Sequence, residues 1–122
     1  MLGIDLKMIV MTLYEEARSL FEGKKDFIRR DIEGFDRVFQ FIFTDKPEEN
    51  YYIEFSKGNV VVGKGIHSSP HVKFSMKTDT YRRITSGELD GEQAYMLGLI
   101  SIDGSIYDAA RFGYILQKLL RR

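Results

Sequence analysis

His67 and His71 are the residues of this chain whose type and spacing most readily suggest metal chemistry. On a helix, a four-residue spacing would bring both imidazoles to one face, where they could share a metal ion. Between them stand Ser68, Ser69 and Pro70, and a proline disfavours a helix at this position. The spacing also ties no acidic third ligand to the pair. We therefore expect a loop with solvated histidines, no metal site and no cofactor.

Nucleophilic catalysis by Ser68 or Ser69 would need a base, oxyanion donors and a strained turn that exposes the hydroxyl. Neither serine lies in a Gly-x-Ser-x-Gly elbow. The segment 63–65, Gly-Lys-Gly, matches half of a dinucleotide-binding fingerprint, but the third glycine and a following helix start are missing. We therefore predict that the chain has no catalytic residues and is not an enzyme. The enzymatic alternative requires His67 or His71 to lie buried beside a carboxylate.

The composition excludes several other kinds of protein. The 122 residues include no cysteine, which excludes disulfides, thiol nucleophiles and cysteine-ligated zinc. Eighteen basic and eighteen acidic residues balance, so no net field attracts nucleic acid. No stretch approaches the roughly 20 apolar residues of a membrane span, and Asp5 and Lys7 interrupt an apolar start that would otherwise resemble a signal peptide. We expect a cytoplasmic protein that does not bind nucleic acid.

The first half of the chain changes from a helical to an extended pattern. Apolar residues at three- and four-residue steps predict a helix over 4–22, with Asp5 as its N-cap and Gly23 as its stop. The charged segment 22–33 fits either a short helix or an irregular connection. From residue 35 to 43 the period is two, with phenylalanines on one face and Gln40 on the other. Strands over 51–56 and 60–62 then complete an antiparallel meander.

The second half adds strands and helices in alternation. A strand with one solvent-exposed face and one buried face is predicted over 72–76. Two short helices follow, the first capped by Thr78 or Asp79 and the second by a capping box of Asp90 and Gln93. A fifth strand follows over 99–102. The closing helix, 106–122, has Ser105 as its expected cap. Divided by segment, the expected single domain comprises the N-terminal helix, a sheet and helix core over 34–104, and the closing helix over 105–121.

Five residues in the second half carry a resemblance to a known family: Gly87, Leu89, Ala94, Gly98 and Gly104. Their spacing resembles the sterol carrier protein type 2 family, in which a Gly-x-Leu turn precedes an Ala-containing helix and two glycines bracket the last strand. The resemblance covers roughly 35–120. It implies an α+β fold, in which a five-stranded, largely antiparallel sheet carries helices on one face, with an apolar tunnel between the layers. It also implies a noncatalytic carrier of sterols, fatty acids, acyl-coenzyme A or similar lipids.

Two departures from the family pattern limit what the resemblance implies. The chain printed here ends in Leu-Leu-Arg-Arg and lacks the Ser-Lys-Leu-type peroxisomal address that some members carry. Ser105 stands where an acidic residue is common in the family. The resemblance therefore indicates no peroxisomal address and no particular ligand.

The closing helix is apolar over more than the one face that packing on a sheet requires. We therefore predict that a hydrophobic ligand binds between the sheet and this helix. The expected wall residues are Phe41, Phe43, Phe74, Met76, Met96, Ile102, Phe112, Ile115, Leu116 and Leu119. The same apolar excess fits an alternative, in which the helix packs against a second copy or another protein, or presents apolar substrate to an enzyme. A transient membrane contact through this helix and its terminal arginines is a further possibility to test.

Overall fold

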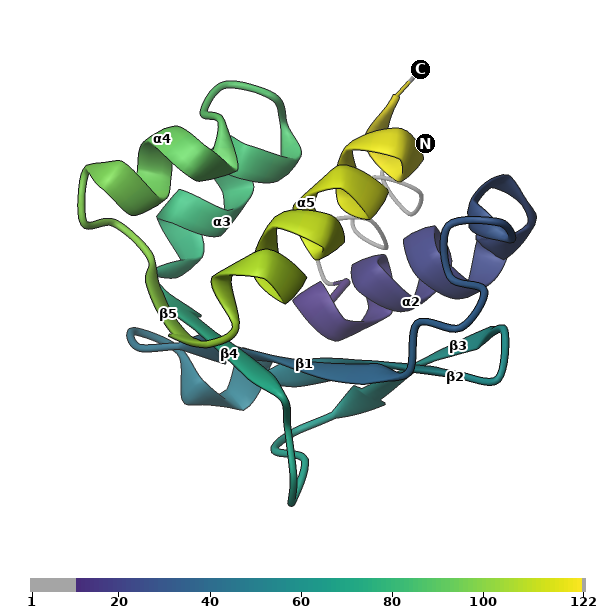
Figure 1. Cartoon of the computed structure of the whole chain (residues 1–122). Helices are drawn as coiled ribbons and strands as arrows, with labels where there is room; N and C mark the ends of the chain where they lie inside the picture. Colours follow the sequence, from purple (N-terminus) through teal and green to yellow (C-terminus); the bar gives the residue numbers. More distant parts are fainter. Residues whose placement is uncertain (1–10, 122) are drawn as a thin grey trace, which may run out of the picture.

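The computed structural model describes residues 11–121, which form one five-stranded sheet with helices over one of its faces (Figure 1). The strand order is β3-β2-β1-β4-β5, and only the β1–β4 pair is parallel. The strands are β1 (Arg37–Phe43), β2 (Tyr51–Ser56), β3 (Asn59–Lys64), β4 (Val72–Met76) and β5 (Ser101–Gly104). The helices are α2 (Leu13–Gly23), η1 (Lys25–Ile28), η2 (Pro47–Glu49), α3 (Thr78–Thr85), α4 (Gly91–Met96) and α5 (Ile106–Leu120). The predicted α+β class and mostly antiparallel sheet are confirmed.

Helix α2 begins later than the sequence pattern predicts. Thr12 has extended backbone angles, and its side chain accepts a hydrogen bond from the Glu15 amide while the Glu15 carboxylate accepts one from the Thr12 amide at 2.9 Å. This capping box starts α2 at Leu13. The prediction of one continuous helix over 4–22 is therefore wrong at residue 12, and the predicted Asp5 cap lies outside the described residues.

Gln40 is the buried polar side chain of β1. The sequence pattern places Gln40 on the face of β1 opposite the phenylalanines, and in the structure Gln40 has no exposed surface. Its amide nitrogen donates to the Gly65 carbonyl at 2.8 Å and the Tyr51 carbonyl at 3.1 Å, and its amide oxygen accepts from the His67 amide at 2.7 Å. These bonds hold the loop after β3 against the face of the sheet that the main helices leave open.

Other element boundaries differ from prediction for local reasons. The N-cap of α3 is Lys77, because Asp45 accepts hydrogen bonds from both the amide and the hydroxyl of Thr78, at 2.9 and 2.7 Å. Asp90 is the N-cap of α4, as predicted, but its side chain makes no capping bond, so the predicted capping box is absent. Strand β5 starts two residues later than expected. Ser105 caps α5 through a bond from the Asp108 amide, which confirms that prediction.

Candidate functional site

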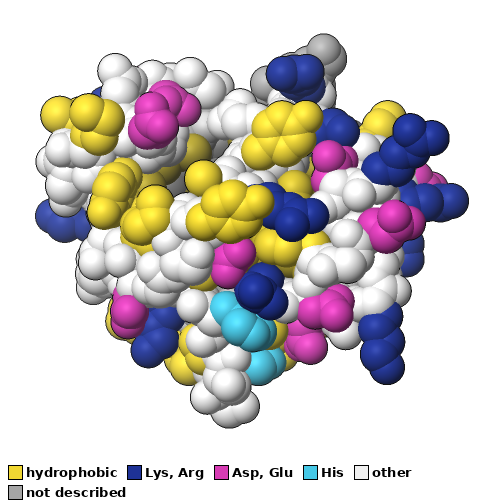
Figure 2. Space-filling model, viewed as in Figure 1, with side chains coloured by type: hydrophobic (Ala, Val, Ile, Leu, Met, Phe, Trp, Pro, Cys, Tyr) yellow, Lys and Arg dark blue, Asp and Glu magenta, His cyan; other side chains and the backbone are white. Residues whose placement is uncertain are grey.

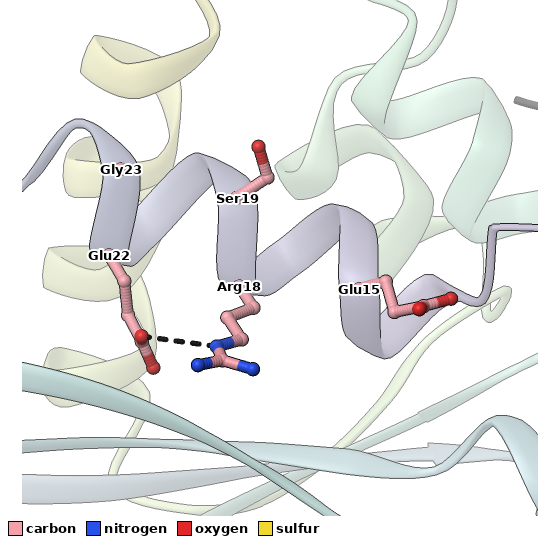
Figure 3. A pocket seen from close by; sticks show the side chains of 5 residues that line it. All are labelled: Glu15, Arg18, Ser19, Glu22 and Gly23. Atoms are coloured by element: carbon pink, nitrogen blue, oxygen red, sulfur yellow. Dashed lines mark hydrogen bonds and ion pairs between the residues drawn. The ribbon is translucent and has the colours of Figure 1, made fainter.

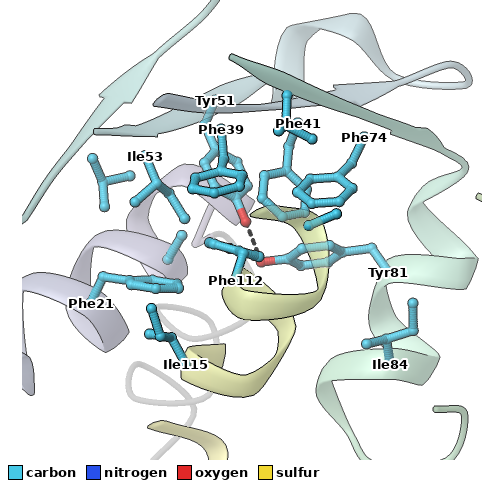
Figure 4. Packing of buried hydrophobic residues seen from close by; sticks show 14 of the residues in the cluster. Phe21, Phe39, Phe41, Tyr51, Ile53, Phe74, Tyr81, Ile84, Phe112 and Ile115 are labelled. Carbon is cyan, nitrogen blue, oxygen red and sulfur yellow. Dashed lines mark hydrogen bonds between the residues drawn. The ribbon is translucent and has the colours of Figure 1, made fainter. Parts of the chain in front are cut away.

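The layer between the sheet and α5 is filled by aromatic side chains. Phe112, on α5, lies 4.6 Å from Phe39, 5.5 Å from Phe74 and 5.7 Å from Phe41, measured between ring centroids. Phe21 of α2 stacks on the same ring at 5.7 Å. Figure 4 shows these rings meeting in the middle of the layer. Rings packed this closely leave no room for the hydrocarbon chain of a ligand unless the rings move.

The ten predicted wall residues differ in burial. Seven lie buried in the core: Phe41, Phe43, Phe74, Met76, Phe112, Ile115 and Leu119. Ile102 and Leu116 are partly buried against that core, whereas Met96 is 77% exposed on α4. The structure therefore does not bring the ten together around one opening, and their contact with a ligand stays a prediction.

Two surface cavities within residues 11–121 lie away from this layer. A surface cavity of about 450 Å³ is lined by Glu15, Arg18, Ser19, Glu22 and Gly23 along α2. Figure 3 shows the Arg18 guanidinium paired there with Glu22, at 3.3 Å. The smaller one, of about 120 Å³, adjoins η1 and the β2–β3 turn. Because charged groups line the larger cavity, it does not suit an apolar ligand.

Helix α5 turns one flank toward η1 and the opposite flank toward α3 and α4. Arg111 donates to the Asp31 carbonyl and Lys118 pairs with the Asp31 carboxylate at 2.8 Å, which places both side chains on the η1 flank. Helical periodicity puts Ile106, Gly113 and Leu120 on the other flank. A Cβ atom added at Gly113 would meet no described atom within 4 Å. The α5 surface that faces α3 and α4 therefore has open space beside it.

Hydrophobic side chains gather around this open space. Figure 2 shows them on α4 and on the first turns of α5, with a hollow between the α3–α4 pair and α5. Ile106 is 51% exposed at the start of α5, on the same flank as Gly113, and Met96 is 77% exposed on α4. We call this surface the α4–α5 rim: Tyr95, Met96, Leu97, Leu99 and Ile106. Exposed apolar side chains that gather in this way commonly mark a place where a ligand or partner binds.

Two tyrosine hydroxyls lie inside the otherwise apolar layer. The Tyr51 and Tyr81 oxygens are 2.8 Å apart, and the side chains are 1% and 8% exposed. Burial raises the pKa of Tyr81 to about 12 and raises that of Tyr51 well above its usual value, and the Glu16 carboxylate adds to both shifts. No sequence pattern predicted this pair. The sequence did indicate two tyrosines at buried positions, and a buried tyrosine hydroxyl needs a hydrogen-bond partner, so a pairing could have been suspected.

The histidines serve the loop on the opposite side of the sheet. The His67 Nδ1 accepts from the Ser69 amide at 2.9 Å, and the His71 Nδ1 accepts from the Val38 amide at 2.9 Å. The His67 Nε2 lies 3.6 Å from a Glu54 oxygen, slightly beyond hydrogen-bonding distance. The predicted loop is confirmed. Within residues 11–121, no group of three or more acidic or histidine side chains is placed to hold a metal ion.

Helices of the described chain are all too short or too polar to cross a membrane.

Comparison with protein families and solved structures identifies similar proteins. A family model described as the SCP-2 sterol transfer family matches residues 19–117. A curated relative, sterol carrier protein 2 of Arabidopsis thaliana, is 29% identical over 65 residues, which are 53% of this chain and 53% of that protein. The chain thus matches about half the length of this curated relative.

Solved structures share the fold at low sequence identity. The solution structure of sterol carrier protein domain 2 of Helicoverpa armigera superposes with a TM-score of 0.69, at 19% identity, over 89% of this chain and 86% of that chain. The sec-alkylsulfatase Pisa1 from Pseudomonas gives a TM-score of 0.61 at 18% identity, over 70% of this chain and 14% of the sulfatase. The same fold therefore occurs both as most of a short chain and as a small part of a long enzyme.

Proposed function

Because the chain belongs to the SCP-2 sterol transfer family, we propose that it binds and carries a lipid-like hydrophobic molecule without chemically changing it. Sterols, fatty acids and fatty acyl-coenzyme A are the ligand classes that fit this proposal. Family membership is the observation that carries it, because it covers residues 19–117. The apolar rim beside α5 supports it independently, since a lipid carrier needs hydrophobic surface that its own core does not use.

The hollow between α5 and the α3–α4 pair is the place where we propose that the ligand binds. Gly113 leaves space beside α5, and the exposed Met96 lies on the α4–α5 rim. The packed rings around Phe112 would form the inner wall, so deeper insertion would require them to move. Burying about ten methylene groups at roughly 0.8 kcal/mol each gives about 8 kcal/mol, which before ordering costs corresponds to roughly micromolar affinity.

A leucine at position 113 tests this location. The neutral fluorescent probe N-phenyl-1-naphthylamine should bind the wild-type protein and be displaced by fatty acids, and extraction with mass spectrometry should recover lipid from fresh preparations. Gly113→Leu should reduce probe affinity at least tenfold because its side chain fills the open space, while the helix itself tolerates leucine better than glycine.

Gly23→Leu is the matched control, since Gly23 ends α2 and a Cβ atom added there also meets no described atom within 4 Å. Probe affinity should stay unchanged in this variant. Equal affinity in all three proteins would contradict the proposed location, and the absence of both probe binding and extracted lipid would contradict the proposed function.

A protein-interaction module is the second candidate function, and the exposure of the α4–α5 rim favours it. Leu97 is 68% exposed next to Met96 and close in the chain to Leu99, an arrangement that would suit packing against a second copy or against an enzyme whose apolar substrate the domain presents. Sedimentation velocity distinguishes this candidate. A dimer that Leu97→Asp converts to a monomer, without loss of probe binding, would assign the rim to association.

Contact with a membrane surface is the remaining partner that we propose. Arg121 follows the apolar closing helix and is exposed, so anionic headgroups are the matching surface. Flotation with phosphatidylglycerol liposomes tests this contact, and protein that stays at the bottom of the gradient would contradict it. A cytoplasmic location remains a prediction that cell fractionation can check.

A further inference from the structure

The tyrosine pair lies where α3 faces the aromatic layer. The Tyr81 ring, carried by α3, meets the Phe43 and Phe41 rings edge-on at 5.2 and 5.8 Å, and the Tyr51 ring stacks on Phe41 at 4.9 Å. Figure 4 shows Tyr81 and Ile84 projecting from α3 toward α5, with the two hydroxyls meeting near Phe112. The pair is therefore on the inner side of the proposed ligand site.

Within residues 11–121, the tyrosine pair has one more O–H proton than it has acceptors. Two hydroxyl groups carry two protons, but the Tyr51–Tyr81 hydrogen bond uses only one of them. Among residues 11–121, neither hydroxyl has another hydrogen-bond partner. A buried donor without an acceptor costs free energy, so an acceptor brought by a ligand would be bound favourably here. Because burial raises both pKa values above 10, the two groups remain protonated donors at neutral pH.

We propose that the Tyr51–Tyr81 pair binds the polar end of the ligand, and that the preferred ligands are lipids with an acceptor oxygen, such as a carboxylate or a carbonyl. This inference rests on the proposed lipid-carrier function and assigns two residues to the polar end of its ligand. The Glu16 carboxylate disfavours negative charge at both hydroxyls, and its ion pair with the Arg82 guanidinium at 2.6 Å offsets only part of this effect, so a neutral carbonyl suits the pair better than a carboxylate. A pure hydrocarbon would leave the spare proton unpaired.

Three ligands with a twelve-carbon chain test the inference by displacement of N-phenyl-1-naphthylamine. They are dodecane, methyl dodecanoate and dodecanoic acid. The test variant is Tyr51→Phe/Tyr81→Phe, which removes both hydroxyls, keeps both rings and leaves no single hydroxyl stranded. Compared with wild type, its affinity for the ester or the acid should fall about tenfold, whereas its affinity for dodecane should be unchanged. Comparing proteins for each ligand removes the effect of ligand solubility.

Tyr52→Phe is the matched control. Tyr52 follows Tyr51 on β2, but its ring lies against Gly63 and near His67 on the opposite face of the sheet. This variant should bind all three ligands like wild type. Thermal unfolding confirms that each variant is folded. If the double variant is not, ultraviolet difference spectra of the wild-type protein replace it: the ester or the acid should shift the tyrosine absorption band more than dodecane does, and equal shifts would contradict the inference.

The outcomes separate the two proposals. Loss for the acid only would assign the pair to carboxylates, and loss for both oxygen-bearing ligands would extend the assignment to neutral carbonyls. Unchanged affinity for all three ligands in the folded double variant would overturn the inference while the lipid-carrier function stands. If wild type binds neither the probe nor any twelve-carbon ligand, the proposed function fails, and the inference fails with it.

Discussion

At the residue scale, Tyr51 and Tyr81 are coupled through one buried hydrogen bond. We expect Tyr51→Phe and Tyr81→Phe each to lower the free energy of unfolding by about 1–3 kcal/mol, because each leaves a lone buried hydroxyl. The double variant should lose less than the sum of the two, since it strands no polar group. Urea denaturation of the four proteins measures this coupling, and additive losses would contradict it.

The same pair should make the protein sensitive to alkali. The folded-state pKa of Tyr81 is about 12, above the value of about 10 in an unfolded chain, so folding favours the protonated form. The corresponding stability is fully present below pH 10 and is lost as the pH rises toward 12. For a two-unit shift, the loss is about 2–3 kcal/mol.

Urea denaturation between pH 8 and 11.5 measures this dependence. The decline in unfolding free energy should be shallower in Tyr51→Phe/Tyr81→Phe than in wild type, and Tyr52→Phe should follow wild type. A decline of the same slope in all three proteins would assign the alkaline sensitivity to other groups.

At the element scale, Gln40 joins β1 to the loop after β3 through buried hydrogen bonds. Gln40→Leu should lower the free energy of unfolding by about 2–4 kcal/mol, because the Gly65 carbonyl and the His67 amide lose their partners. Hydrogen exchange should also become faster at the His67 amide. Gln117→Leu, at an exposed position of α5, is the control and should change stability by less than about 0.5 kcal/mol. Protection of the His67 amide in Gln40→Leu equal to wild type would show that the loop does not depend on Gln40.

The helix starts differ in whether the local sequence predicts them. The capping box of Thr12 and Glu15 has the Thr-x-x-Glu spacing, so the true start of α2 was present in the sequence although the apolar stripe suggested a longer helix. The local sequence does not predict the start of α3. Asp45 caps it from 33 residues away, and no local pattern indicates such a partner.

At the scale of the whole molecule, ligand binding should stabilise the fold by mass action. At a free dodecanoic acid concentration 100 times the Kd, the expected gain is about 2.7 kcal/mol, which raises Tm by several degrees. Gly113→Leu should show a much smaller rise because its side chain occupies the proposed site, and Gly23→Leu should rise like wild type. Differential scanning calorimetry measures these shifts, and an equal rise in all three proteins would place the ligand elsewhere.

The bounds of β2 and β4 could be predicted without coordinates because the alternation of buried and exposed side chains is a local pattern, and the α+β class followed from the family resemblance. Whether the layer beneath α5 is open is set instead by packing in three dimensions. That depends on how Phe112 meets Phe39 and Phe74, residues far apart in the chain whose rings fill the space that an apolar pattern alone suggests as a tunnel. The pairing of Tyr51 with Tyr81 could not be predicted from the sequence either, because packing between the layers, rather than spacing along the chain, sets which hydroxyls meet.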